Sequence, residues 1–377
     1  MLAGMMTMSS STSMRSDTHL SPSRIKLARE RRGMSKVVLA GALGVTTRAL
    51  QAYETDGAPR ARLLELARVL DVVPTFLQRP ERSALDEDQV SFRARRRATA
   101  YQRTAARAAG SIGIEFYGWI LGRFRLPAVN LPDLDREPPE RAAAHLRSVW
   151  GQGTESLPNL VQLSEANGVK VMSLPLDAET VDAFSLWQDG QPYVFLSTTK
   201  TAERSRFDLA HELGHLAMHS RGCVDGDAER EADAFASALL IPRDSLLARA
   251  GREPATPQIL RLRSYYRVSA MAVARSLHDV GRLSDWAYRQ NCVSLAQMGY
   301  RSGEPGGITR ELSRVFRLVL ESLRANGSGP QVISDDLGLT PRDLHGFTFG
   351  QVVMPIAGDD QGTSVDRPSL RLLRGSG

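Results

Sequence analysis

The chain has 377 residues, which is too long for one ordinary hydrophobic core, so two or three domains are expected. Its formal net charge is +6, with the excess coming from arginine, which makes nucleic acid a natural partner to test. Only two cysteines occur, which excludes a disulfide framework and a cysteine-rich zinc site and favours the cytoplasm. No apolar run approaches 18 residues, so neither a membrane span nor a membrane partner is expected.

Composition and periodicity divide the chain into six predicted segments. The first twenty residues are rich in methionine, serine and threonine, residues 78–89 are polar, and strand patterns appear at 169–174 and 192–197. The predicted segments are a disordered leader at 1–20, a helical domain at 21–78, a basic linker and helix at 79–140, an α+β domain at 141–250, a helical region at 251–350 and a flexible tail at 351–377.

The helical domain begins with four short apolar patches. They lie at 25–29, 37–43, 46–53 and 63–70. Ser35 is placed to cap the second helix, Gly44 to end it, and Thr46 to cap the third. Two short helices joined by such a turn form the helix-turn-helix element, whose second helix enters the major groove of DNA.

The third helix carries the candidate DNA contacts. Ala49 and Leu50 are expected to face the core, which turns the intervening polar side chains outward. Arginine pairs with guanine and glutamine with adenine, whereas a lysine at the start of the second helix suits a phosphate. The predicted DNA-contacting residues are Lys36, Thr46, Thr47, Arg48 and Gln51. The alternative is a four-helix bundle that binds protein.

Residues 22–78 resemble the lambda-repressor/Cro-like, or Xre-type, family. Arg-x-x-x-Gly-Met-Ser, Leu-Ala-x-x-Leu-Gly-Val, Tyr-Glu-x-x-Gly and Leu-Ala-x-x-Leu occur in the family's order. The family often has glutamine where Lys36 stands, which argues against a base contact there. The resemblance implies that a homodimer binds a double-stranded DNA operator and reads two half-sites.

A metal-binding pattern stands in the α+β domain. His211-Glu212-Leu-Gly-His215 places two histidines four residues apart, on one face of a helix. These two residues are therefore predicted to bind one Zn²⁺ ion, and Glu212 to act as general base on water.

The following helix supplies candidates for the third ligand. Glu229, Ala232 and Asp233 have the Glu-x-x-Ala-Asp spacing that resembles thermolysin-type zinc peptidases. In those enzymes the glutamate is the third ligand and the aspartate orients a ligating histidine. The resemblance therefore implies Glu229 as the third ligand and Asp233 as the residue that orients a ligating histidine, with Glu231 as the rival ligand.

A strand at 193–197 is expected at the sheet edge beside the metal-binding helix. An extended peptide could add to that edge and present its carbonyl to zinc.

Residues 141–243 resemble the ImmA/IrrE family of metallopeptidases. The resemblance rests on Arg206-Phe-Asp-Leu-Ala-His-Glu-Leu-Gly-His and on Glu-x-Glu-Ala-Asp-x-Phe-Ala-x-x-Leu-Leu-Ile-Pro. It implies a zinc endopeptidase that cleaves an Xre-type repressor. The fusion also resembles a class of bacterial regulators, as do the stretches 91–93 and 301–305. The expected fold class is multidomain: an all-α helix-turn-helix domain, an α+β zincin-like metallopeptidase domain and a mostly helical C-terminal region.

Other features have less specific interpretations. We expect His219 to pack or cap a helix end, although a ligand or supporting role is the alternative, and Arg206 to pair with Asp208. The basic run 93–107 suits DNA phosphates or a solvated face equally well. Residues 258–277 and 332–344 have helix-turn-helix spacing, and packing is favoured over DNA contact for both.

Three functions are consistent with these patterns. The first is a DNA-binding regulator with a working endopeptidase, which cleaves a repressor-like partner or its own linker at 78–89. The second is a transcription factor whose zinc domain senses a signal without hydrolysis. The third is an antitoxin-like module whose middle domain docks a partner. Glu212 favours the first, because a structural zinc site has no use for a general base.

Overall fold

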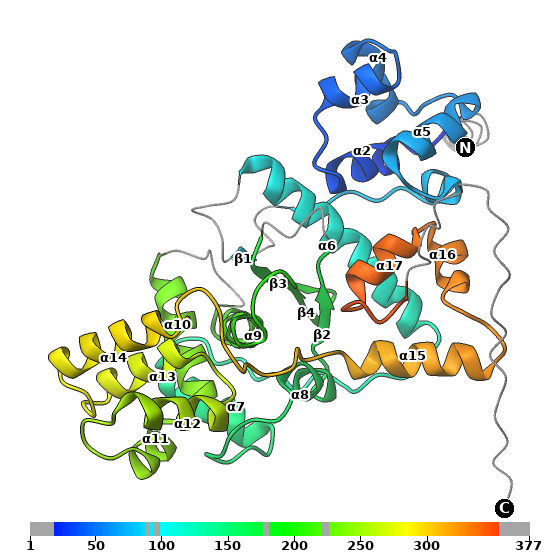
Figure 1. Cartoon of the computed structure of the whole chain (residues 1–377). Coiled ribbons are helices and arrows are strands. Elements are labelled where there is room, and N and C mark those ends of the chain that lie inside the picture. The colour runs from blue at the N-terminus through cyan, green and yellow to red at the C-terminus, as the bar shows by residue number, and fades with distance from the viewer. Residues whose placement is uncertain (1–18, 87–90, 93–98, 176–180, 220–225, 354–377) are drawn as a thin grey trace, which may run out of the picture.

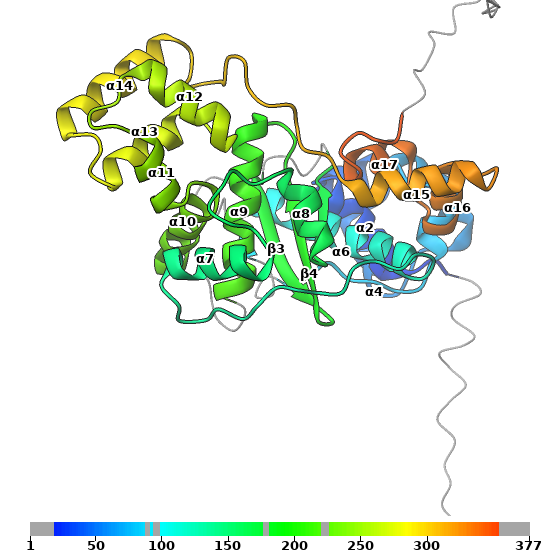
Figure 2. The same cartoon turned by 90° about the horizontal axis from the view of Figure 1, so that it is seen from below.

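A computed structural model describes residues 19–86, 91–92, 99–175, 181–219 and 226–353. A bundle of short helices forms one end of the molecule, a four-stranded sheet with flanking helices lies in the middle, and a lobe of helices forms the other end (Figures 1 and 2). Among the residues that the structure describes, no helix is both long enough and apolar enough to span a membrane.

The N-terminal bundle has the predicted helix-turn-helix layout. Its elements are α2 (Pro22–Arg31), α3 (Lys36–Ala42), α4 (Thr47–Thr55), η1 (Arg60–Arg62), α5 (Leu63–Leu70) and η2 (Pro74–Gln78). The hydroxyl of Ser35 accepts a hydrogen bond from the Val38 amide, and that of Thr46 from the Ala49 amide. Gly44 has φ +60° between the two helices, a conformation that glycine adopts without strain.

The central sheet is mixed. Its strands are β1 (Ser91–Phe92), β2 (Lys170–Ser173), β3 (Ala183–Gln188) and β4 (Gln191–Leu196), in the order β1-β3-β4-β2. β3 and β4 form an antiparallel hairpin whose turn, Asp189–Gly190, has positive φ at both residues. β2 pairs with β4 in parallel and β1 with β3 antiparallel. The expectation of an edge strand at 193–197 is therefore wrong, because β4 lies inside the sheet.

Five helices surround the sheet. They are α6 (Ala100–Leu121), α7 (Pro139–Val149), α8 (Leu160–Ala166), α9 (Ala202–Met218) and α10 (Gly226–Leu240). α9 packs on β3 and β4, and α10 packs on α9 and α7. A Cβ on Gly214 of α9 would lie only 3.0 Å from the Phe235 ring and 3.3 Å from the Ala232 Cα, so a glycine there lets α10 approach closely.

The C-terminal region first builds a lobe and then returns to the N-terminal bundle. Its helices are α11 (Arg243–Arg249), α12 (Thr256–Tyr266), α13 (Ala270–Asp279), α14 (Asp285–Gln297), α15 (Arg314–Ala325), α16 (Gln331–Leu337) and α17 (Pro341–Phe347). Asp343 of α17, 1 % exposed, pairs with Arg31 at 2.7 Å and Arg32 at 3.6 Å. The end of the region also reaches β2, where the Phe349 amide donates to the Ser173 hydroxyl at 2.7 Å.

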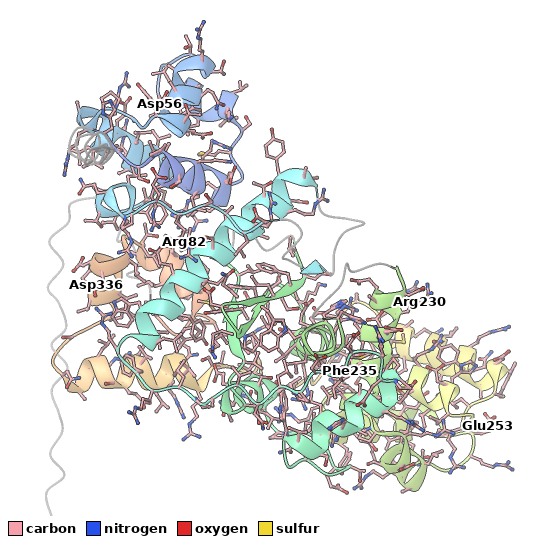
Figure 3. All side chains as sticks on the ribbon, turned by 180° about the vertical axis from the view of Figure 1, so that it is seen from behind. Asp56, Arg82, Arg230, Phe235, Glu253 and Asp336 are labelled. Carbon is pink, nitrogen blue, oxygen red and sulfur yellow. The ribbon has the colours of Figure 1, made fainter. Side chains whose placement is uncertain are left out.

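The connection after the bundle is less free than the polar stretch 78–89 suggests. Arg24 donates to the Pro80 carbonyl at 2.7 Å and to both carboxylate oxygens of Glu115 on α6. Arg82 donates to the Ser111 hydroxyl at 2.9 Å, and Leu85 is buried (Figure 3). Residues 78–86 are thus fixed between α2 and α6, and residues 87–90 lie outside the described part.

The expected fold class is confirmed: a helical helix-turn-helix bundle, a small mixed sheet with helices, and a mostly helical C-terminal region. At the ends, the predicted leader up to residue 18 and the tail from 354 lie outside the described residues. His19 and Leu20 already pair with the bundle through Pro59 and Ala58, and Val352 is buried.

Candidate metal centre and DNA-binding surface

Two histidines meet on the buried face of α9. The helix begins after Thr201, whose hydroxyl accepts a hydrogen bond from the Arg204 amide, and runs for 17 residues, long enough to carry both. His211 and His215 are 1 % and 3 % exposed, and their Nε2 atoms lie 3.0 Å apart. The spacing of four residues thus produces the shared face that the sequence predicts.

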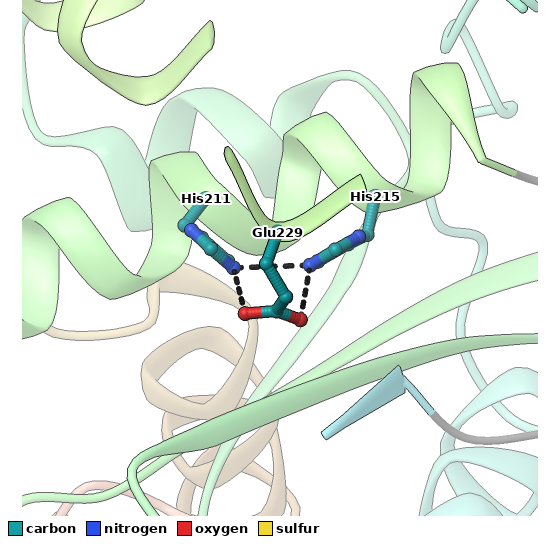
Figure 4. Close-up of side chains that lie close together, drawn as sticks. All are labelled: His211, His215 and Glu229. Atoms are coloured by element: carbon teal, nitrogen blue, oxygen red, sulfur yellow. Dashed lines mark hydrogen bonds and ion pairs between the residues drawn. The ribbon is translucent and has the colours of Figure 1, made fainter. Parts of the chain in front are cut away.

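Glu229 of α10 completes the cluster from the opposite side. Its Oε1 lies 3.3 Å from the His215 Nε2 and its Oε2 lies 3.6 Å from the His211 Nε2 (Figure 4). One ligand atom from each of these three residues lies within 4.8 Å of the others. The rival ligand, Glu231, instead places its carboxylate 2.9 Å from His219.

A second layer of hydrogen bonds orients the two imidazoles. The His211 Nδ1–H donates to Asp233 at 2.8 Å, as the sequence predicts. The His215 Nδ1 lies 3.1 Å from the Nδ1 of His219, whose Nε2 in turn lies 2.9 Å from Glu231. His219 caps the end of α9, as expected, and its ring also supports His215. Both Nδ1 atoms are therefore engaged, which leaves the Nε2 atoms to face the cluster.

The donor set fits a zinc ion. Two ligand atoms bound about 2.0–2.1 Å from a tetrahedral zinc lie about 3.3 Å apart. The three separations here, 3.0, 3.3 and 3.6 Å, bracket that value. Two Nε2 lone pairs directed at each other repel, so a cation between them is the arrangement that relieves the contact.

The charge states also suit metal binding. Burial lowers the pKa of His215 to about 4, so its imidazole is neutral at pH 7. For Glu229, burial by itself raises the pKa, but the adjacent side chains of His211 and His215 outweigh it and bring the pKa to about 2. Neutral imidazole and ionised carboxylate are the forms that ligate metals.

Glu212 points from α9 towards the sheet. Its side chain is 0 % exposed, and its Oε2 accepts a hydrogen bond of 2.6 Å from the hydroxyl of Ser185 on β3. Sequence reasoning missed Ser185 because it missed β3. The signal that could have found the strand is the Asp189–Gly190 pair between two apolar runs, which is typical of a hairpin turn.

The DNA-binding candidates lie on and beside α4. Thr46, Thr47, Arg48 and Gln51 are all exposed, whereas Leu50 is fully buried, so the predicted inward and outward faces are present. Lys36, half-buried on α3, is hydrogen-bonded to the Gln51 side chain, which joins two candidates that the sequence treats separately. Figure 1 shows α3 and α4 at the outer end of the molecule, away from the sheet.

A buried ion pair beneath α4 was not predicted. Arg29 of α2 donates to both carboxylate oxygens of Glu54 at 2.5 and 3.1 Å. Arg29 ends the first apolar patch and Glu54 directly follows the third, but nothing in a linear pattern shows that they meet.

Other predicted features are placed differently. Arg206 does not pair with Asp208: it pairs with Glu311, while Asp208 lies 3.4 Å from Arg204 and 3.8 Å from Lys200. The reason is that Arg206 turns inward towards the C-terminal segment. Of the stretch 301–305, Glu304 accepts a hydrogen bond of 2.9 Å from Arg263. Residues 93–98 of the basic run lie outside the described part of the chain.

Both further helix-turn-helix patterns pack within the protein. α16 and α17, at 332–344, lie against η2 and α2, where a Cβ on Gly338 would come within 2.4 Å of the Phe76 backbone. α12 and α13, at 258–277, pack on each other and on α14, and α13 also borders a cleft of about 1190 Å³ lined by α7, α9 and α10. These contacts support the packing interpretation of both patterns.

Comparison with known proteins identifies two domains. A family model described as the IrrE N-terminal-like domain matches residues 164–278, and one described as a helix-turn-helix matches residues 25–77. No curated protein matches the chain. The first match covers β2 to α13 and includes the whole histidine–glutamate cluster. The chain is therefore a DNA-binding regulator in which an Xre-type helix-turn-helix domain is fused to an IrrE/ImmA-like peptidase-family domain.

Proposed function

We propose that the middle domain is a zinc endopeptidase and that its substrate is a separate, repressor-type protein. The observation that carries this proposal is the convergence of His211, His215 and Glu229 beside the buried carboxylate of Glu212. A purely structural zinc site has four protein ligands and needs no carboxylate beside it.

The three clustered residues would hold the metal. Asp233 and His219 fix the orientation of the two imidazoles, and the close packing of α10 on α9 brings Glu229 to them. When bound, zinc supplies Lewis-acid polarisation of a peptide carbonyl.

Glu212 would move the proton. Its carboxylate takes a proton from the water that attacks the carbonyl carbon and gives it to the nitrogen that leaves. Ser185 donates to one carboxylate oxygen and so holds the side chain in a single orientation.

The N-terminal bundle would bring this peptidase to an operator. The exposed face of α4 presents Thr47, Arg48 and Gln51 to base edges, and Lys36 lies beside them for the phosphate backbone. A homodimer would read two half-sites, because a single helix of this kind covers too few base pairs for specific binding.

A separate substrate is favoured over the chain's own linker at 78–86. A peptidase substrate must lie extended in the site, but these residues are tied to α2 and α6 through Pro80, Arg82 and Leu85. Cleavage there would require the DNA-binding bundle to detach first.

A substrate trap tests the proposal. Glu212→Gln keeps the shape and the metal ligands but removes the proton acceptor, so the variant should retain a protein that the wild type releases cut. The control is His211→Ala/His215→Ala, which should retain nothing because the metal is gone. Identical sets of intact proteins on the wild type, the trap and the control would refute the peptidase proposal. A cut in the chain itself within 78–86 would show that the substrate is the chain's own linker and not a separate protein.

A further inference from the structure

The outer edge of β3 is the sheet edge nearest to Glu212. Ser185 of β3 donates to the Glu212 carboxylate at 2.6 Å, and α9 packs directly on this strand. A peptide that adds to a sheet pairs its backbone with an edge strand. The opposite edge, β2, lies two strands away and is contacted at Ser173 by residues 346 and 349 of the C-terminal segment.

The chain itself occupies the β3 edge. β1 is antiparallel to β3, with Ser91 opposite Ser185 and Phe92 opposite Phe184. In Figure 4 the cyan arrow of β1 lies beside the strands that pass below the three clustered side chains. The pairing is therefore centred on the residue that holds Glu212.

We propose that residues 91–92 act as an internal strand that occupies the substrate position of the peptidase and keeps it inactive until it is displaced. This inference rests on the proposed peptidase function. Glu212 is 0 % exposed in the arrangement that has β1 on the β3 edge. An extended protein substrate would take over the backbone pairing to β3 at residues 184 and 185.

The pairing has the properties of a displaceable contact. It involves two residues of β1, whereas β3 extends over six, so a longer substrate strand can make more hydrogen bonds than the internal one. The internal strand competes through its tether, which gives it an effective concentration on the order of millimolar. Because β1 belongs to the connection between the DNA-binding bundle and α6, a shift of the bundle would pull on the same strand.

Peptide binding tests the inference without relying on cleavage. The probe is a fluorescent synthetic octapeptide with the sequence of residues 88–95, added to zinc-loaded Glu212→Gln protein. Ser91→Pro/Phe92→Pro removes both backbone N–H donors of β1. The matched control, Glu81→Pro/Asp86→Pro, puts two prolines at exposed positions of the same connection. The β1 variant should bind the peptide about tenfold more tightly than the parent, and the control should match the parent.

Hydrogen–deuterium exchange supplies the second measurement. Residues 183–188 should exchange faster in the β1 variant and regain protection when the peptide is added. If the proline variant does not fold, Ser91→Gly/Phe92→Gly, which weakens the strand but keeps its amides, should give a smaller shift in the same direction. Equal peptide affinity in parent and variant, or a cut within 87–98 in the zinc-loaded wild type, would overturn the inference. If the affinity shifts but no protein is ever cleaved, the edge assignment stands and the proposed function fails.

Discussion

The metal centre and the DNA-reading helix differ in the exposure of their functional side chains and in how firmly the protein orients them. His211, Glu212 and His215 are at most 3 % exposed and their orientations are fixed by Asp233, Ser185 and His219. On α4, by contrast, the side chains that would touch DNA are exposed, and the fixed contacts lie beneath them, at Leu50 and Glu54.

The difference shows which side chains the protein itself must hold in place and which side chains the bound ligand positions. A metal ligand must be placed to a few tenths of an ångström, so buried hydrogen bonds hold it in position. A DNA-reading side chain receives its final placement from the DNA, so the protein needs only a rigid helix to carry it. Substitutions should therefore act on metal content at the first site, on stability beneath α4, and on sequence preference on its surface.

The largest effect is expected at the metal centre. His211→Ala/His215→Ala removes two of the three clustered ligands and should lower the zinc content from about one ion per chain to none. Metal analysis of the purified protein measures the zinc content per chain. His145→Ala, an exposed histidine beside Glu137, is the control and should keep its zinc. Equal zinc in the double variant and the wild type would contradict the ligand assignment.

The ion pair beneath α4 should have the next largest effect. Arg29→Met leaves the buried Glu54 with only the more distant Lys36, at 3.7 Å, as a cation, and breaking a buried pair typically costs about 3–5 kcal/mol of stability. The urea dependence of hydrogen exchange in α2 and α4 measures this loss of stability within the full chain. Arg29→Met/Glu54→Leu removes both charges and should lose much less. If the single and the double variants lose the same stability, charge burial is not the cause.

A buried carboxylate in the peptidase half should instead give a pH dependence. Burial raises the pKa of Glu165 to about 7, although the Ser313 hydroxyl and the amides of Arg314 and Val315 donate to it. Between pH 4.5 and 7 the folded state therefore holds a proton that the unfolded state has lost, so stability falls as pH rises, by roughly 3 kcal/mol at most. Denaturation at several pH values measures the slope. Glu165→Gln should flatten it, and an unchanged slope would assign it to another group.

The DNA-reading surface should show the smallest free-energy changes and the most specific ones. Arg48→Ala and Gln51→Ala should each cost about 1–3 kcal/mol on the operator and little on random DNA. Lys36→Ala should weaken binding to all sequences and reduce the salt dependence. Titrations of operator DNA and random DNA at several salt concentrations separate the loss of sequence preference from the loss of phosphate contacts. A change in sequence preference in Lys36→Ala would show that its hydrogen bond to Gln51 persists on DNA.

Local patterns predicted what lies on one helix or one turn. The caps at Ser35 and Thr46 and the shared face of His211 and His215 follow from spacing within a few residues. The contact of Asp233 with His211 joins two helices across 22 residues and was expected from the resemblance to zinc peptidases. Contacts between distant segments could not be predicted in this way. The interior position of β4 depends on β3, and the pairing of Arg206 with Glu311 spans 105 residues. The roles of these residues in zinc, DNA and substrate binding remain predictions.

The supporting layer of the metal centre shows the same limit. His219 follows His215 by four residues, so their proximity is predictable, but its contact with Glu231 requires the packing of α10 on α9. Ser185 depends on a strand whose composition, Ala-Phe-Ser-Leu-Trp-Gln, has little β-propensity at three of six positions. Tertiary packing, rather than local preference, places it against Glu212.

The most direct test of the central claim compares protein cleavage by the zinc-loaded wild type and by Glu212→Gln. Both are expressed at equal levels in cells, and new protein N-termini are identified by mass spectrometry. We predict cuts in a repressor-type protein that depend on Glu212 and vanish in His211→Ala/His215→Ala. The same N-termini in all three strains and in a zinc-bound Ser91→Pro/Phe92→Pro protein, in which the internal strand no longer blocks the site, would contradict the claim that this regulator is a peptidase.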